Sequence, residues 1–166
     1  YEAAFFFNGV FVYADILVED EEGWKVYEVK SSTSVKEINI LDTALQSYVI
    51  EQNGIKLKDV CIVHLDNTYA RDGEIEIEEL FTKISVLSEV KTLLPRIPKE
   101  IERLKNVIDR ETLPEKSKGA HCFSPYTCDF MGQCWDHIPE NTVFNIRNLS
   151  TKKKFELYDQ GIVLIK

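Results

Sequence analysis

The sequence contains no hydrophobic run that approaches the ~20 apolar residues needed to span a bilayer. It also has no charged-then-apolar leader, no internal repeat and no low-complexity segment. These absences argue against a membrane-spanning, targeted or repeat protein. We therefore expect a cytoplasmic protein with no membrane partner.

Positive charge is in short supply. The chain has 20 Lys and Arg residues against 28 Asp and Glu residues, a net charge of −8. Because binding to a nucleic-acid backbone is driven largely by cationic contacts, this balance gives such binding no overall support. Basic residues do gather between positions 83 and 118 and again at 152–154, which leaves room for a local basic groove.

The amount of apolar sequence suits one ordinary globular domain. With 166 residues, 44% of them hydrophobic and 29% charged, the chain is long enough to bury a core. Residues 1–7 and 162–166 both read as parts of strands. We therefore expect a piece of a longer chain, in which residues 141–166 lead into a following domain.

Residues 1–7, 10–18 and 24–30 are strand-like, and an Asn-Gly turn and a polar turn join them into a predicted three-stranded meander. Apolar residues then recur at three- and four-residue spacing, which predicts a helix from about residue 34 to an Asn-Gly at 53–54. The apolar residues 60–65 predict a buried strand, which a crossover helix can bring into parallel pairing. The predicted fold class is α/β.

The rest of the chain reads as a helical and cysteine-bearing cap. We expect a strand or loop around Ile75 and Ile77, helices over 85–94 and 99–110, an irregular stretch over 113–134 and a return to strand character in the tail. The corresponding organisation is a core over 1–82, an extension of the same domain over 83–140, and a tail over 141–166.

Two charged residues stand near the end of the strand over 24–30. Side chains alternate along a strand, so Glu28 and Lys30 point the same way and Val29 is expected to point into the core. Asp15, one hairpin earlier, is a candidate neighbour. Mg²⁺ prefers oxygen ligands and needs only one or two protein carboxylates. Asp15, Glu28 and the Val29 carbonyl are therefore candidate ligands, with Lys30 beside the ion and a surface ion pair as the alternative interpretation.

The pattern of Asp15, then Glu28-Val29-Lys30, then a helix with Gln46 resembles the PD-(D/E)xK nuclease superfamily, in particular its RecB-like exonuclease branch. The resemblance covers roughly residues 1–65 and implies a restriction-endonuclease-like core. It implies that Asp15 and Glu28 bind Mg²⁺ or Mn²⁺, that Lys30 is catalytic and that Gln46 lies beside the site. The implied activity is hydrolysis of DNA, including single-stranded DNA, by an exonuclease.

Two features of the same region extend or depart from this resemblance. Glu2 is a candidate further acidic residue at the edge of the site. The branch commonly has a tyrosine four residues after the glutamine, where this chain has Ile50, and Tyr48 lies on another face of the helix. The alternative function is a catalytically inactive nuclease-fold domain that serves as a nucleic-acid-binding or scaffold module.

Cys122, Cys128 and Cys134 fall within thirteen positions of turn-rich sequence. Disulfides are rare in the cytoplasm, and this spacing fits no standard zinc finger. Ligation of a metal is one interpretation, with zinc held together with His121 or His137, and reduced thiols are another. Cys61 and His64, on an apolar strand, are expected to be structural.

Some RecB-like exonucleases, including CRISPR-associated and AddB-type ones, carry a four-cysteine iron-sulfur cluster, and the spacing of Cys128 and Cys134 is similar to theirs. The resemblance implies a 4Fe-4S cluster on these three cysteines, with a fourth ligand outside this chain. Zn²⁺ is the alternative occupant.

Overall fold

The computed structural model describes residues 1–112 and 117–165. It divides into two compact units, residues 1–111 and 112–166. This boundary falls inside the segment 83–140, which the sequence predicts as one extension. Each unit is described by itself.

The N-terminal unit begins with a hairpin of its own. Strands β1 (Ala3–Phe7) and β2 (Val10–Ala14) pair antiparallel in a two-stranded sheet, with Ala3 opposite Ala14. Asn8 and Gly9 between them have φ angles of 47° and 74°. Two successive positive φ angles are what a tight hairpin turn requires, and Asn-Gly adopts them most readily. The predicted turn is confirmed.

A second, four-stranded sheet carries the candidate site. It contains β3 (Ile16–Asp20), β4 (Gly23–Lys30), β5 (Leu57–Leu65) and β6 (Phe81–Ser85), in that order. Strand β4 pairs antiparallel with β3 and parallel with β5, and β6 returns antiparallel, so the sheet is mixed. The single strand predicted over 10–18 is therefore two strands in two sheets, because the chain changes partners at Asp15.

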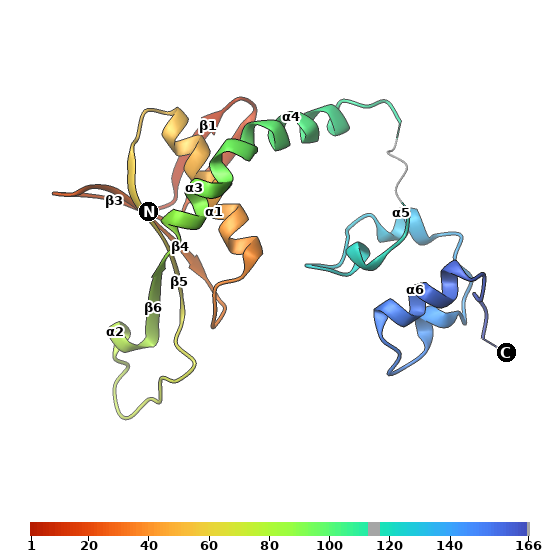
Figure 1. Cartoon of the computed structure of the whole chain (residues 1–166). Coiled ribbons are helices and arrows are strands. Elements are labelled where there is room, and N and C mark those ends of the chain that lie inside the picture. The colour runs from red at the N-terminus through yellow and green to blue at the C-terminus, as the bar shows by residue number, and fades with distance from the viewer. Residues whose placement is uncertain (113–116, 166) are drawn as a thin grey trace. The chain divides into compact units, whose positions relative to one another are not determined.

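Helix α1 (Glu37–Gln52) makes the crossover between β4 and β5, as the sequence predicts. It packs against the hairpin, β5 and helix α3 (Leu87–Leu93), and Figure 1 shows α1 and α3 together over the strands. The side chains buried between these elements include Val26, Ala44, Ile50, Ile62 and Val90. Helices α1 and α3 thus cover one face of the sheet.

The chain after β5 differs in part from the prediction. Where a strand or loop is expected around Ile75 and Ile77, Ile75 lies in a loop and Ile77 begins the short helix α2 (Ile77–Leu80), which strand β6 follows. The helices over 85–94 and 99–110 are confirmed as α3 and α4 (Ile97–Ile108), with the 3-10 turn η1 (Leu94–Arg96) between them. β6 is held by five register pairs with β5, a tertiary contact that its short local pattern does not signal.

The C-terminal unit consists of short elements around an aromatic cluster. They are η2 (Ala120–Cys122), α5 (Met131–Trp135), η3 (Val143–Asn145) and α6 (Thr151–Asp159). Rings of Phe123, Trp135, Phe144, Phe155 and Tyr158 pack edge-on or tilted, with centroids 4.7 to 6.2 Å apart. The prediction of strand character in the tail is wrong for residues 151–159, which are helical because Ser150 caps Lys153 N–H.

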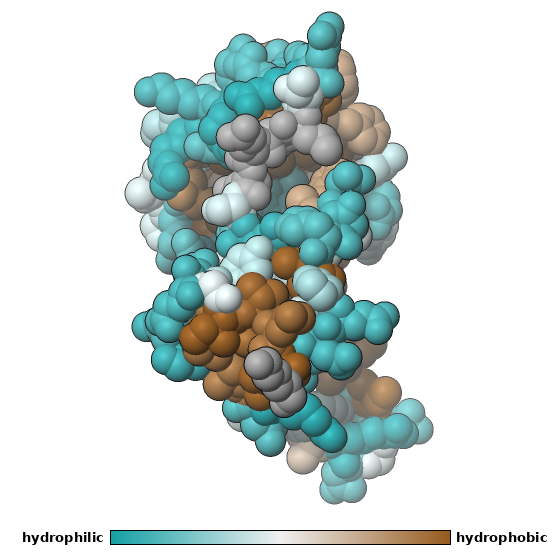
Figure 2. Space-filling model, turned by 90° about the vertical axis from the view of Figure 1, so that its right-hand side faces the viewer, coloured by the Kyte–Doolittle hydropathy of each residue, from teal (hydrophilic) through white to brown (hydrophobic). Residues whose placement is uncertain are grey.

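This unit leaves much of its apolar surface uncovered. Ile162, Leu164 and Ile165 are each more than two-fifths exposed. Figure 2 shows hydrophobic side chains gathered on the face of the unit turned to the viewer. So short a segment has too little volume to bury all of its large side chains.

The chain has an α/β fold with a mixed four-stranded sheet and helices, as predicted in outline. Across residues 1–112 and 117–165, none of the helices combines the length and the apolar character that a bilayer crossing requires.

Candidate functional site

Asp15 lies at the break between β2 and β3, where it links the two sheets. Its carbonyl accepts a hydrogen bond from Glu2 N–H at 3.0 Å, on the side of β1. Its side-chain Oδ2 accepts one from Val29 N–H at 2.7 Å, on the side of β4. Because β3 pairs with β4 only as far as Ile16 opposite Tyr27, the Asp15 carboxylate takes the place of the next backbone partner.

Glu28 and Lys30 share one face of β4, as the alternation predicts, but that face is the covered one. Glu28 is 5% exposed, on the side of Val26, whereas Val29 is 42% exposed. The prediction that Val29 points into the core is wrong. The helices bury the face that carries the charges, so a carboxylate lies where an apolar side chain is expected.

The Lys30 ammonium joins β4 to α1. Its Nζ donates to Glu28 Oε1 at 2.6 Å and to Asp42 Oδ2 at 2.7 Å. Asp42 is a residue that the sequence reasoning missed. Its one available signal is its position, four residues before Gln46 and thus on the same side of the helix.

Gln46 lies beside Glu28, as the resemblance implies. It is 6% exposed, and its side-chain amide is near enough to Glu28 to lower the pKa of that carboxyl. Within the part of the chain that the structure describes, buried Glu28 Oε2 and Gln46 Oε1 lack a hydrogen-bond partner. Ser47 Oγ and Trp135 Nε1 are two further buried atoms of this kind. Such atoms are uncommon in folded proteins, and a water or an ion can satisfy them.

Burial and the neighbouring polar groups have opposite effects on the pKa values of Glu28 and Lys30. Burial raises the pKa of Glu28 above its usual value, with Asp15 adding to the rise, while Lys30 and Gln46 act against it. Burial alone would lower the pKa of Lys30, but hydrogen bonds to Asp42 and Glu28 outweigh it and hold the pKa above its ordinary value. Lys30 is thus an ammonium at neutral pH, a donor of hydrogen bonds and positive charge.

The donor set at the end of β4 fits a small divalent cation. Asp15 and Glu28 supply two carboxylates, and the Val29 carbonyl belongs to the same stretch. Glu28 Oε2 is the buried oxygen that such an ion would satisfy. In residues 1–112 and 117–165, no three His, Cys, Asp or Glu side chains gather closely enough to hold a metal, so any ion here relies on two carboxylates, backbone oxygen and water.

The cysteine segment does not form a ligand set as it stands. Cys122 is buried, Cys128 half-buried and Cys134 exposed, and all three are free thiols. The Cys128 N–H donates to the Cys122 carbonyl at 2.9 Å, which brings their backbones together. Among the described residues, these three thiols do not come close enough together to hold a metal ion. The 4Fe-4S cluster and its Zn²⁺ alternative therefore stay predictions.

Other candidate residues have structural places. Tyr48 packs edge-on against Phe7, with ring centroids 5.9 Å apart, and Ile50 is fully buried. Cys61 and His64 are buried on β5, as expected for structural residues, and His64 Nδ1 lies 2.9 Å from the Leu65 carbonyl. Glu2 is exposed, and its backbone N–H donates a hydrogen bond to the Asp15 carbonyl.

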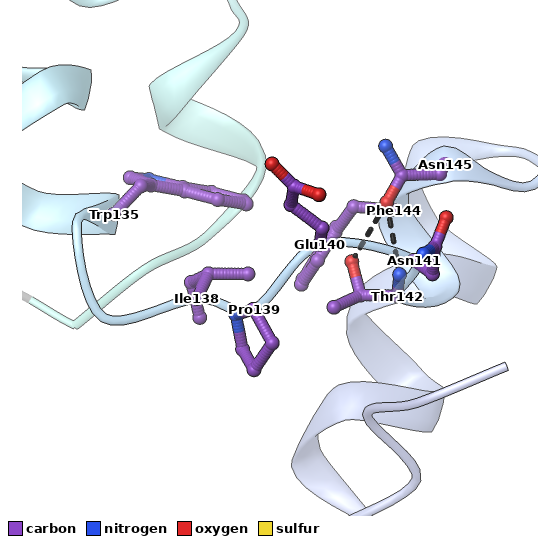
Figure 3. Close-up of a pocket in the computed structure, with 8 residues that line it drawn as sticks. All are labelled: Trp135, Ile138, Pro139, Glu140, Asn141, Thr142, Phe144 and Asn145. Carbon is purple, nitrogen blue, oxygen red and sulfur yellow. Dashed lines mark hydrogen bonds between the residues drawn. The ribbon is translucent and has the colours of Figure 1, made fainter.

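A separate pocket of about 470 Å³ lies in the C-terminal unit. Figure 3 shows Trp135, Ile138 and Phe144 among its lining residues, with Asn145 Oδ1 accepting from the Thr142 N–H and hydroxyl at 2.9 and 3.2 Å. These two bonds cap the η3 turn and leave the amide oxygen occupied. The pocket therefore has an aromatic wall, and Glu140 contributes a carboxylate to its lining.

Comparisons with protein-family models, with curated proteins and with solved structures found no match to this chain. A function for it therefore has to be argued from the residues and geometry described above.

Proposed function

We propose that this chain is a divalent-metal-dependent nuclease that hydrolyses phosphodiester bonds of DNA, acting as an exonuclease on a restriction-endonuclease-like core. One observation carries the proposal. Asp15, the β4 residues Glu28 and Lys30, and Gln46 of α1 come from three parts of the chain and lie around the end of β4, with a buried carboxylate oxygen left without a partner. The order strand, helix, parallel strand around them supports the same core.

Each side chain has a role in this proposal. Asp15 and Glu28, with the Val29 carbonyl, would hold Mg²⁺ or Mn²⁺. The bound ion supplies Lewis acidity toward the scissile phosphate and its attacking water. The Lys30 ammonium orients that water and offsets negative charge as it develops. The amide of Gln46 would hold the Glu28 carboxylate in its orientation. The proposed partner is DNA, including single-stranded DNA.

The test is a hydrolysis assay with end-labelled and circular DNA in Mg²⁺ or Mn²⁺. Lys30→Ala and Asp15→Ala should each abolish cleavage, whereas Glu51→Gln, which removes a charge elsewhere on α1, should cleave as the wild type does. An exonuclease should degrade the linear DNA and spare the circle. Equal cleavage by all four proteins would refute the assignment.

A non-catalytic function is favoured by one specific observation. The position four residues after Gln46 is Ile50, fully buried, where the resembled branch has a tyrosine. In this alternative, the fold serves as a nucleic-acid-binding or scaffold module. Calorimetric titration with Mn²⁺ separates the two functions, because a scaffold does not require the metal and a nuclease does.

For the C-terminal segment we propose that Cys122, Cys128 and Cys134 ligate a 4Fe-4S cluster, with Zn²⁺ as the alternative. The closeness of the Cys122 and Cys128 backbones supports a shared ligand. Such a cluster would steady a unit made of short elements and would take no part in hydrolysis.

A further inference from the structure

The strand and the helix at the site are joined by one hydrogen bond, from Lys30 Nζ to Asp42 Oδ2 at 2.7 Å. On β4, Glu28 and Lys30 are two residues apart, and on α1, Asp42 and Gln46 are four residues apart. Two residues of a strand advance by ~6.6 Å and four residues of a helix by ~6 Å. The spacings therefore match, so the bond between Lys30 and Asp42 leaves Gln46 near Glu28, where it lowers the pKa of that carboxyl.

The two hydrogen bonds that Lys30 Nζ donates hold the ammonium in different ways. The bond between Lys30 and Glu28 joins residues of the same strand, so it holds the ammonium only relative to β4. The bond to Asp42 Oδ2 holds the ammonium relative to α1, the element that also carries Gln46. If Glu28 turned to engage another partner, Asp42 would be the contact that keeps Lys30 in place.

We propose that Asp42 is a positioning residue of this site, which holds the Lys30 ammonium between α1 and β4 and aims its remaining N–H at the reacting group. An ammonium has three N–H donors, of which Glu28 and Asp42 take two. The third is left for water or phosphate. The catalytic side of this inference rests on the proposed nuclease function, whereas the placement of the ammonium does not.

The placement is measured first, on the full chain labelled with ¹⁵N-lysine and without metal. An ammonium held in two ion pairs exchanges its protons slowly and gives a visible ¹⁵N–H resonance, whereas solvated lysines exchange too fast. The wild type should show a Lys30 resonance, assigned by its disappearance in Lys30→Arg. Asp42→Asn should lose it, Glu51→Gln should keep it, and Asp42→Glu should restore it at least in part.

The catalytic consequence is measured on the same variants. Asp42→Asn should lower kcat by about 10- to 100-fold, the usual effect of removing a partner that orients an active-site group. KM should change by less than about twofold, because Asp42 does not touch the substrate. Asp42→Glu should recover part of the rate, and Glu51→Gln should match the wild type.

The two measurements separate the two claims. A wild type that cleaves no DNA refutes the nuclease function, and the resonance still decides the role of Asp42. A Lys30 resonance that is missing in the folded wild type, or that persists in Asp42→Asn, overturns the positioning role. So does an Asp42→Asn enzyme with the kcat of Glu51→Gln.

Discussion

Replacing Lys30 with methionine removes the positive partner of a buried carboxylate and keeps the length of the side chain. Glu28 would remain covered, with neither carboxylate oxygen bonded to an ammonium. Removing one partner of a buried ion pair costs about 3–5 kcal/mol. The Lys30 side chain is 24% exposed, so solvent offsets part of this cost. We expect Lys30→Met to lower the free energy of unfolding by about 2 kcal/mol at pH 8.

The cost should depend on pH, and its sign follows from Glu28. Without Lys30, burial and Asp15 raise the folded-state pKa of Glu28 further above its unfolded value of 4.5. A raised carboxyl pKa means that the folded state binds the proton more tightly, so stability falls as pH rises through the window above 4.5. The gap between Lys30→Met and the wild type should therefore be wide at pH 8 and narrow toward pH 4.5. The double variant Glu28→Gln/Lys30→Met should recover most of the loss at pH 8.

Urea unfolding followed by tryptophan fluorescence measures these differences. The chain has two tryptophans, so a Trp135→Phe background leaves Trp24, on β4, as the reporter of the N-terminal unit. For an m-value of about 2 kcal/mol/M, the midpoint of Lys30→Met should fall by about 1 M. Equal midpoints at pH 8, or a gap of the same size at both pH values, would refute the burial argument.

Three further predictions concern other parts of the chain. Gly23→Ala should lower the free energy of unfolding by about 1–2 kcal/mol in the same urea assay, because Gly23 has a φ of +126° and its added Cβ would lie 2.6 Å from Lys58 Cγ. An unchanged midpoint would contradict this prediction. Cys61 should react with iodoacetamide at pH 8 far more slowly than Cys134, because burial and Asp59 raise the pKa of Cys61 to about 11 and Cys134 is exposed. Mass spectrometry of peptides from samples labelled for increasing times measures the two rates, and faster labelling of Cys61 would contradict the prediction. The protein, purified without oxygen, should be brown with visible iron-sulfur absorbance, whereas a colourless sample loaded with zinc would exclude the cluster.

Local signals in the sequence predict the elements that depend on local chemistry. Asn8-Gly9 marks the hairpin because two positive φ angles suit these residues, and the three- and four-residue spacing marks α1. The same signals place Glu28 and Lys30 on one face of β4. They do not say which face is covered, because that depends on where α1 packs, and Val29 is exposed for this reason.

Features that depend on tertiary contacts could not be predicted from the sequence. The break at Asp15 arises because the chain exchanges β1 for β4 as its partner, although residues 10–18 are apolar on both sides of Asp15 and read as one strand. β6 is defined by its pairing with β5. Asp42 looks like any exposed helix acid until the structure places its carboxylate 2.7 Å from Lys30 Nζ.

The site of the cation is what the proposed function depends on most. Crystals of the chain grown with Mn²⁺ should give an anomalous peak within coordination distance of Asp15 and Glu28, and crystals of Asp15→Ala should give none there. Mn²⁺ bound elsewhere, with both carboxylates unliganded at saturating metal, would contradict the account.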